Sequence, residues 1–132
     1  MKSSLAPGLK ASRRITVDAP RTIAFMGEDG RVYATPHMVS DMEYCCRDAM
    51  LAHLDAGEDS VGARVEIDHL GPTPIGAWVD FTVTLAEVKG RRVAFDFTAR
   101  DAVEEVGRGR HVRFIVDTAR TLERVRAKAK AR

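Results

Sequence analysis

The stretch from Ala34 to His69 constrains the fold more than any other part of this 132-residue chain. At about 100° per residue, its apolar side chains over residues 36–56 fall in one broad arc. So wide an arc predicts one long helix that is covered on most of its sides. Thr35 is the predicted N-cap, Pro36 suits the first helical position, and Gly57 the C′ position. The side chains in the arc are Met38, Val39, Met42, Cys45, Cys46, Ala49, Met50, Ala52 and Leu54.

The strand predicted after this helix covers residues 60–69 and ends in a histidine. Its apolar and polar residues alternate, so His69 closes the row that faces inward behind Val65 and Ile67. Glu43 falls inside the apolar arc of the helix, where a carboxylate is expected only if it has a charged or hydrogen-bonding partner or a functional role. Two titratable groups are therefore predicted to face the core from neighbouring elements.

The rest of the chain predicts a sheet of antiparallel strands. One helix can cover five strands only if the sheet curls around it, and that arrangement is the hot-dog fold, of class α+β. The open edges of such a sheet favour pairing between two copies of the chain. The other predicted strands are residues 13–17, 76–88, 92–100 and 103–117, with Gly107 and Gly109 as candidate bulges.

Length and composition predict a single domain over residues 11–117, preceded by a flexible leader over residues 1–10. The hydrophobic fraction of 45% and charged fraction of 30% are typical of a soluble globular protein. No apolar run approaches the roughly 18 residues of a membrane span. With no apolar segment of the signal-peptide kind near the start, we expect a cytoplasmic protein without membrane attachment. The adjacent Cys45 and Cys46 are interpreted as core residues, and no metal site is expected.

The charge is distributed unevenly along the chain. Residues 118–132 hold six basic side chains and one acidic one, a net charge of +5, so the other 117 residues carry −3 of the overall +2. This basic C-terminal helix or tail could bind nucleic acid or the phosphates of CoA. It lacks interleaved aromatic residues, so a solvated tail is the favoured interpretation and no nucleic-acid partner is expected.

Three short motifs in a fixed order resemble the hot-dog thioesterases related to fluoroacetyl-CoA thioesterase. The resemblance covers roughly residues 10–117, most of the chain. It implies a homodimer with the acyl-CoA site at the subunit interface and no cofactor beyond the CoA of the substrate. The motifs are Thr35-Pro36-x-Met38-Val39-x-x-Met42-Glu43, Ser60-Val61-Gly62, and His69-Leu70-Gly71-Pro72-Thr73-Pro74-x-Gly76.

The resemblance also implies roles for individual residues. Thr35, Glu43 and His69 match the catalytic trio of that family, and Gly62 and Arg113 match residues that contact the substrate. The segment between the first strand and the helix is shorter than the family's aromatic-rich lid. The expected activity is therefore acyl-CoA hydrolysis, with the acyl group left open.

These residues suit thioester hydrolysis chemically. Glu43 in apolar surroundings would have a raised pKa, and it could attack the thioester or deprotonate a water molecule. Thr35 could orient that carboxylate or the water, and N–H groups at the helix start could bind the carbonyl oxygen. His69 could donate a proton or hydrogen bond to the sulfur or carbonyl.

Each residue also has a purely structural interpretation. Glu43 could pair with Arg47 or another cation, His69 could be a core histidine, and Thr35 could be only an N-cap. Gly62 could mark a strand irregularity and Arg113 could be a surface residue. Three further histidines were weighed: His53 is expected to bond a carbonyl at the helix end, His37 to face solvent, and His111 is left undecided.

Two other functions remain open from the sequence. A non-catalytic acyl-CoA-binding domain would keep Gly62 and need neither Glu43 nor His69. A hydroxyacyl-thioester dehydratase would also use a carboxylate and a histidine, but no hydratase-type motif is evident.

Overall fold

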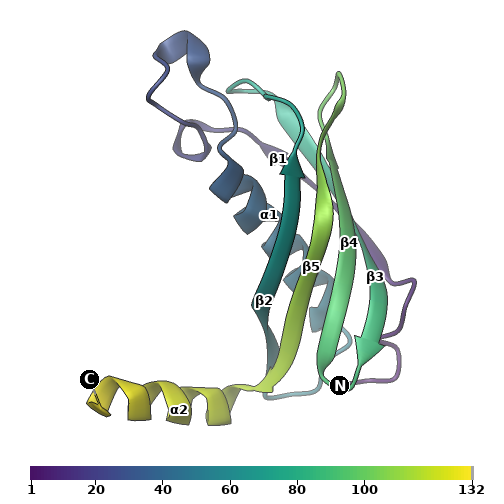
Figure 1. Ribbon diagram of the computed structural model, residues 1–132. Coiled ribbons are helices and arrows are strands. Elements are labelled where there is room, and N and C mark those ends of the chain that lie inside the picture. The colour runs from purple at the N-terminus through teal and green to yellow at the C-terminus, as the bar shows by residue number, and fades with distance from the viewer. Residues whose placement is uncertain (132) are drawn as a thin grey trace.

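The computed structural model describes residues 1–131 and contains one five-stranded antiparallel sheet with a long helix against it. The strand order is β1-β3-β4-β5-β2, so β1 and β2 form the two edges. In Figure 1 the strands bend along their length, and α1 lies against one face of the sheet. The elements are β1 (Lys10–Thr16), η1 (Ala19–Arg21), η2 (Glu28–Gly30), α1 (Thr35–Leu51), β2 (Glu58–His69), β3 (Trp78–Lys89), β4 (Arg92–Arg100), β5 (Glu105–Asp117) and α2 (Thr118–Ala131).

The core lies between α1 and the inner face of β3 and β4. Alternate residues of β3 are buried, among them Val79, Phe81 and Val83, as the sequence alternation predicts. Burying each such side chain contributes about 1.5–3 kcal/mol. Cys45 and Cys46 are buried and free, which confirms their interpretation as core residues.

The ends of α1 differ from the sequence prediction. The N-cap is Ala34, no side chain caps the helix, and Thr35 is the first helical residue. The helix ends at Leu51 rather than Ala56, because the chain turns there with the His53 N–H donating to the Met50 carbonyl. Gly57 does adopt a positive φ of 82°, but it lies in the turn before β2. His53 does not bond a terminal carbonyl with its ring, since its Nδ1 lies 2.8 Å from Ser4 Oγ.

The segment before β1 is packed on the domain, although the sequence predicted a flexible leader. Leu5 is buried in the core, and the Gly8 N–H donates to the Leu85 carbonyl. The amino group of Met1 lies 2.7 Å from Asp55 Oδ2. β1 itself starts at Lys10 and pairs with β3 along its whole length, three residues earlier than predicted.

Two irregularities of β2 and β5 shape the site. The register between them shifts between Gly62 and Arg64, so the interpretation of Gly62 as a strand irregularity is correct. Gly107 and Gly109, expected to be bulges, stay in register with β2, but the pairing of β5 with β4 shifts between Gly107 and Glu105, so an irregularity does lie beside Gly107. Gly109 is needed for close approach, because a Cβ there would overlap the backbone carbonyl of Glu66.

The basic C-terminal segment forms the helix α2, which leaves the sheet at the end of β5 and projects away from it (Figure 1). None of its described residues is buried. Arg132, counted in the basic segment, lies outside the described residues.

Candidate active site

Thr35 and His69 meet where α1 begins and β2 ends. Thr35 Oγ1 lies 2.7 Å from His69 Nδ1, so the threonine hydroxyl bonds the imidazole instead of capping the helix. His69 is half-buried, and burial lowers its pKa while a backbone hydrogen bond at Gly71 offsets part of that effect. The imidazole is therefore largely neutral at pH 7.

The Thr35–His69 pair lines an open hollow of about 450 Å³. Phe25, with 83% of its surface exposed, lines the same hollow from the segment between β1 and α1. The ring of Tyr33 stands edge-on to the His69 ring with centroids 6.4 Å apart. The hydroxyl of Tyr33 donates to Asp41, which also binds Arg21, so this wall of the hollow is fixed by a buried network.

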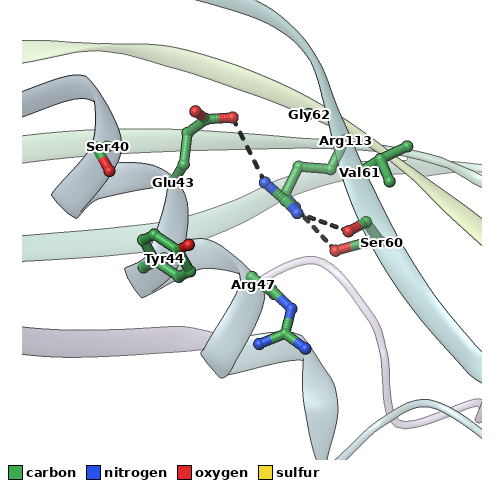
Figure 2. Close-up of a pocket in the computed structure, with 8 residues that line it drawn as sticks. All are labelled: Ser40, Glu43, Tyr44, Arg47, Ser60, Val61, Gly62 and Arg113. Carbon is green, nitrogen blue, oxygen red and sulfur yellow. Dashed lines mark hydrogen bonds and ion pairs between the residues drawn. The ribbon is translucent and has the colours of Figure 1, made fainter. Parts of the chain in front are cut away.

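Glu43 lines a second hollow, of about 570 Å³, eight residues further along α1. Figure 2 shows its carboxylate pointing toward Arg113 across the space between α1 and the sheet. The residues lining this hollow are Ser40, Glu43, Tyr44 and Arg47 from α1, Ser60, Val61 and Gly62 from β2, and Arg113 from β5.

The surroundings of Glu43 are polar and cationic, whereas the sequence predicted an apolar setting. Its Oε1 lies 3.6 Å from Arg113 Nη1 and 3.4 Å from His111 Nε2. About a third of the Glu43 side chain is exposed to the hollow. Arg47, the partner considered from the sequence, instead binds Asp59 through two hydrogen bonds of 2.7 and 3.0 Å.

Arg113 is buried, with 5% of its surface exposed, so its interpretation as a surface arginine is wrong. Its Nε donates to Ser60 Oγ at 2.8 Å and its Nη2 to the Ser60 carbonyl at 2.7 Å. Burial lowers its pKa, and Glu43 opposes that shift. A fixed cation is thus placed beside the carboxylate of Glu43.

Gly62 is the point where β2 passes closest to Glu43. A Cβ at this position would overlap Glu43 Oε1 and would lie 3.3 Å from His111 Cε1. Any larger residue here would displace the carboxylate, so the glycine is part of the site as well as of a bulge.

His111 is the site residue on which the sequence was undecided. It is completely buried, and its Nδ1 lies 2.9 Å from the Arg64 carbonyl oxygen. The signal available in the sequence was its position two residues before Arg113, on the same face of β5. His37 is exposed, as expected.

The structure thus brings the predicted residues together in two groups. Thr35 contacts His69, and Glu43 lies with Gly62 and Arg113, but the two groups line different hollows of one protomer. Eight residues of helix separate Thr35 from Glu43, about 12 Å along the axis. Within residues 1–131, no three His, Cys, Asp or Glu side chains are grouped to hold a metal ion. The expectation that the reaction needs no cofactor stays a prediction.

Comparison with known proteins shows to which class of protein this chain belongs. The fluoroacetyl-CoA thioesterase of Streptantibioticus cattleyicolor is 34% identical over 127 residues, 96% of this chain and 88% of that protein. A solved structure of the fluoroacetyl-CoA thioesterase FlK superposes with a TM-score of 0.87 at 32% identity, covering 93% of this chain and 96% of that one. A Thermus thermophilus protein described as a thioesterase superfamily member gives a TM-score of 0.86 at 28% identity, covering 97% and 98%. The protein is a hot-dog thioesterase.

The family match makes the assignment more specific. The model of the fluoroacetyl-CoA-specific thioesterase family matches residues 17–119. The chain belongs to this family, which confirms the predicted fold and the prediction of an acyl-CoA thioesterase. Among the described residues, neither helix has the length and apolar character needed to cross a bilayer.

Proposed function

We propose that this protein is a homodimeric acyl-CoA thioesterase whose reaction uses Thr35, Glu43 and His69, with Gly62 and Arg113 contacting the substrate. The observation that carries this proposal is the 2.7 Å contact between Thr35 Oγ1 and His69 Nδ1. A threonine that only capped the helix would bond a backbone N–H, and Thr35 does not. CoA as the carrier is supported by the solved structure of an FlK variant in complex with fluoroacetate and CoA.

Glu43 is the group that begins the reaction in this proposal. Its carboxylate is partly exposed in the hollow and lies beside a buried cation. It attacks the thioester carbonyl or removes a proton from the attacking water. The Thr35–His69 pair, with its neutral imidazole, donates a hydrogen bond to the oxygen that becomes negative. When the C–S bond breaks, the proton that Glu43 took from water passes to the departing thiolate; if Glu43 attacks directly, water then hydrolyses the resulting acyl anhydride and supplies that proton.

A second copy of the chain would join the two groups of residues into one site. β2 is an edge strand, and its residues 60–62, of which 61 and 62 begin an exposed run, line the hollow that holds Glu43. If two copies pair antiparallel along β2, the His69 end of one strand lies beside the first half of the other. The Thr35–His69 pair of one protomer would then approach Glu43 of its partner.

Release of free thiol from a panel of acyl-CoA esters tests this function. Hydrolysis frees the thiol. Dehydration of a hydroxyacyl thioester leaves the thioester bond intact, and a binding domain catalyses neither reaction. Glu43→Gln and His69→Ala should each lower kcat by about 10²–10⁴-fold with the fold intact. Glu123→Gln and His53→Ala alter an exposed glutamate of α2 and a histidine outside both hollows, and both variants should keep the wild-type rate.

Wild-type rates in both the Glu43 and His69 variants would refute the assignment of the site. No thiol release from any acyl-CoA ester would refute the proposed activity itself. A cytoplasmic location and the absence of a nucleic-acid partner stay predictions from the sequence.

A further inference from the structure

The two hydrogen bonds of His111 favour one protonation state, and Glu43 Oε1 lies further from its Nε2, at 3.4 Å. Its Nδ1 faces the Arg64 carbonyl oxygen at 2.9 Å, and a carbonyl can only accept a hydrogen bond. Its Nε2 faces Arg113 Nη1 at 3.1 Å, and a guanidinium can only donate. These contacts favour the neutral imidazole with its proton on Nδ1 and a lone pair on Nε2. Burial lowers the pKa of this imidazole, in agreement with that state.

The hydrogen bonds of Arg113 go to groups other than Glu43. Two are donated to Ser60 and one to His111, and Figure 2 shows the Ser60 contacts beside the ion pair with Glu43. The distance from Arg113 Nη1 to Glu43 Oε1 is 3.6 Å, longer than a hydrogen bond. A buried arginine beside a carboxylate commonly binds it through two parallel hydrogen bonds. Here that arrangement is not formed.

We propose that His111 is a positioning residue, which accepts a hydrogen bond from Arg113 and thereby keeps the guanidinium from forming a hydrogen-bonded pair with Glu43. The carboxylate of Glu43 then lies close to the positive charge of Arg113, while its oxygens stay available for water or substrate. This inference rests on the proposed function, in which Glu43 is the reacting carboxylate.

The proposal predicts how the site changes when the Nε2 acceptor is removed. Arg113 Nη1 would then donate to Glu43, which stabilises the carboxylate and lowers its basicity. The charged and titratable groups around Glu43 are Tyr44, Cys46 and Arg47 on α1, and His111 and Arg113 on β5. The β2 residues of this hollow, Ser60, Val61 and Gly62, carry no charge.

Two substitutions separate the two hydrogen bonds of His111. In His111→Gln, the longer side chain can place an amide oxygen near the position of Nε2 and accept from Arg113. In His111→Asn, the shorter amide can donate to the Arg64 carbonyl as Nδ1 does but does not reach Arg113. We expect His111→Gln to keep kcat within about 3-fold of wild type and His111→Asn to lower it by about 10-fold or more.

The pH profile distinguishes positioning from a merely structural role. In His111→Asn the acidic limb of kcat should move down by about one pH unit, with KM changed less than about 3-fold. In His111→Gln that limb should stay in place. Equal losses in both variants, or a loss without a shift of the acidic limb in His111→Asn, would overturn the proposal.

Two NMR measurements need no activity and so separate this inference from the proposed function. The ¹³C titration of the Glu43 carboxyl should move to lower pH in His111→Asn but not in His111→Gln. The ¹⁵N shifts of His111 in the wild-type protein should show the neutral form with its proton on Nδ1. A proton on Nε2, or a Glu43 titration that is the same in all three proteins, would contradict the positioning role even if thioesters are hydrolysed.

Discussion

Thr35 shows at the scale of one residue how the site departs from ordinary helix chemistry. Its hydroxyl bonds His69 and leaves the helix start without a side-chain cap. Replacing it by valine keeps the shape but removes the hydroxyl. We expect Thr35→Val to lower kcat by about 10²-fold, because His69 loses its partner, and Thr35→Ser to stay within about 5-fold of wild type. A Thr35→Val enzyme with the wild-type kcat in the thiol-release assay would remove Thr35 from the mechanism.

Gly62 gives a second prediction at this scale. In Gly62→Ala the new methyl group would overlap Glu43 Oε1, so the carboxylate must leave its present position beside Arg113 and His111. We expect kcat to fall by about 10²-fold. Ala127→Ser changes an exposed residue of α2, away from the β2 edge and both hollows, and serves as the control, with an unchanged kcat. Equal rates for the two variants would show that the position of Glu43 against Gly62 is unimportant.

The buried imidazole of His111 and the half-buried imidazole of His69 predict a pH dependence of stability. Burial lowers the pKa of His69 and of His111 below the ordinary value of 6.5. Between those lowered values and about 6.5, the unfolded chain binds more protons than the folded one, so the free energy of unfolding falls as the pH drops. Carboxylates such as Glu58, whose pKa is lowered to about 2, change the free energy of unfolding only at pH values below this range.

Urea denaturation at pH 7.5 and at about pH 5.5 measures this effect. The loss of stability between these two values should be smaller in His111→Gln, which removes one of the two imidazoles. A wild-type protein that is equally stable or more stable at the lower pH would contradict the burial of neutral histidines.

At the scale of an element, α2 carries five of the chain's 21 basic side chains and one acidic one, but it contributes nothing to the core. It has no buried residue, and it meets the rest of the domain through β5. Deleting residues 120–132 should change KM for acyl-CoA by less than about 3-fold, because solvated cations far from the reacting atoms add little affinity. A large rise in KM would show that α2 binds the phosphates of CoA.

The elements also show what the sequence could predict. The strands β3 and β4 were predictable because one face is buried and the other solvated, which imposes alternation on the residues. The end of α1 was not, because Leu54 is buried from a turn and continues the apolar pattern beyond the helix. The packing of Leu5 depends on contacts distant in sequence, and no local pattern signals it.

In the site, too, local sequence patterns predicted some features, while contacts between residues distant in sequence could not be predicted. The family resemblance implied roles for Glu43, Gly62 and Arg113, but the ion pair between Glu43 and Arg113 joins residues 70 positions apart, and no local pattern signals it. Alternation on β5 predicted that His111 and Arg113 share a face, yet a polar row normally marks the solvated face. Here His111 and Arg113 are buried, because their polar atoms have partners. The Arg64 carbonyl and Ser60 form hydrogen bonds with them, and Glu43 forms an ion pair with Arg113.

At the scale of the whole molecule, the central claim is that the two hollows of one protomer are halves of one catalytic site. One half holds Glu43, Gly62 and Arg113, and the other holds Thr35 and His69. Pairing along the β2 edge would bring the half with Glu43 from one protomer against the half with His69 from its partner. Each active site would then contain Glu43 from one chain and His69 from the other.

Thiol release by a purified mixed dimer of Glu43→Gln and His69→Ala chains tests this claim most directly. A site shared between chains leaves one of the two sites in that dimer intact, so the rate should return to about half that of wild type, although each parent homodimer is nearly inactive. A mixed dimer as inactive as its parents would show that Glu43 and His69 act within the same chain, or not together at all.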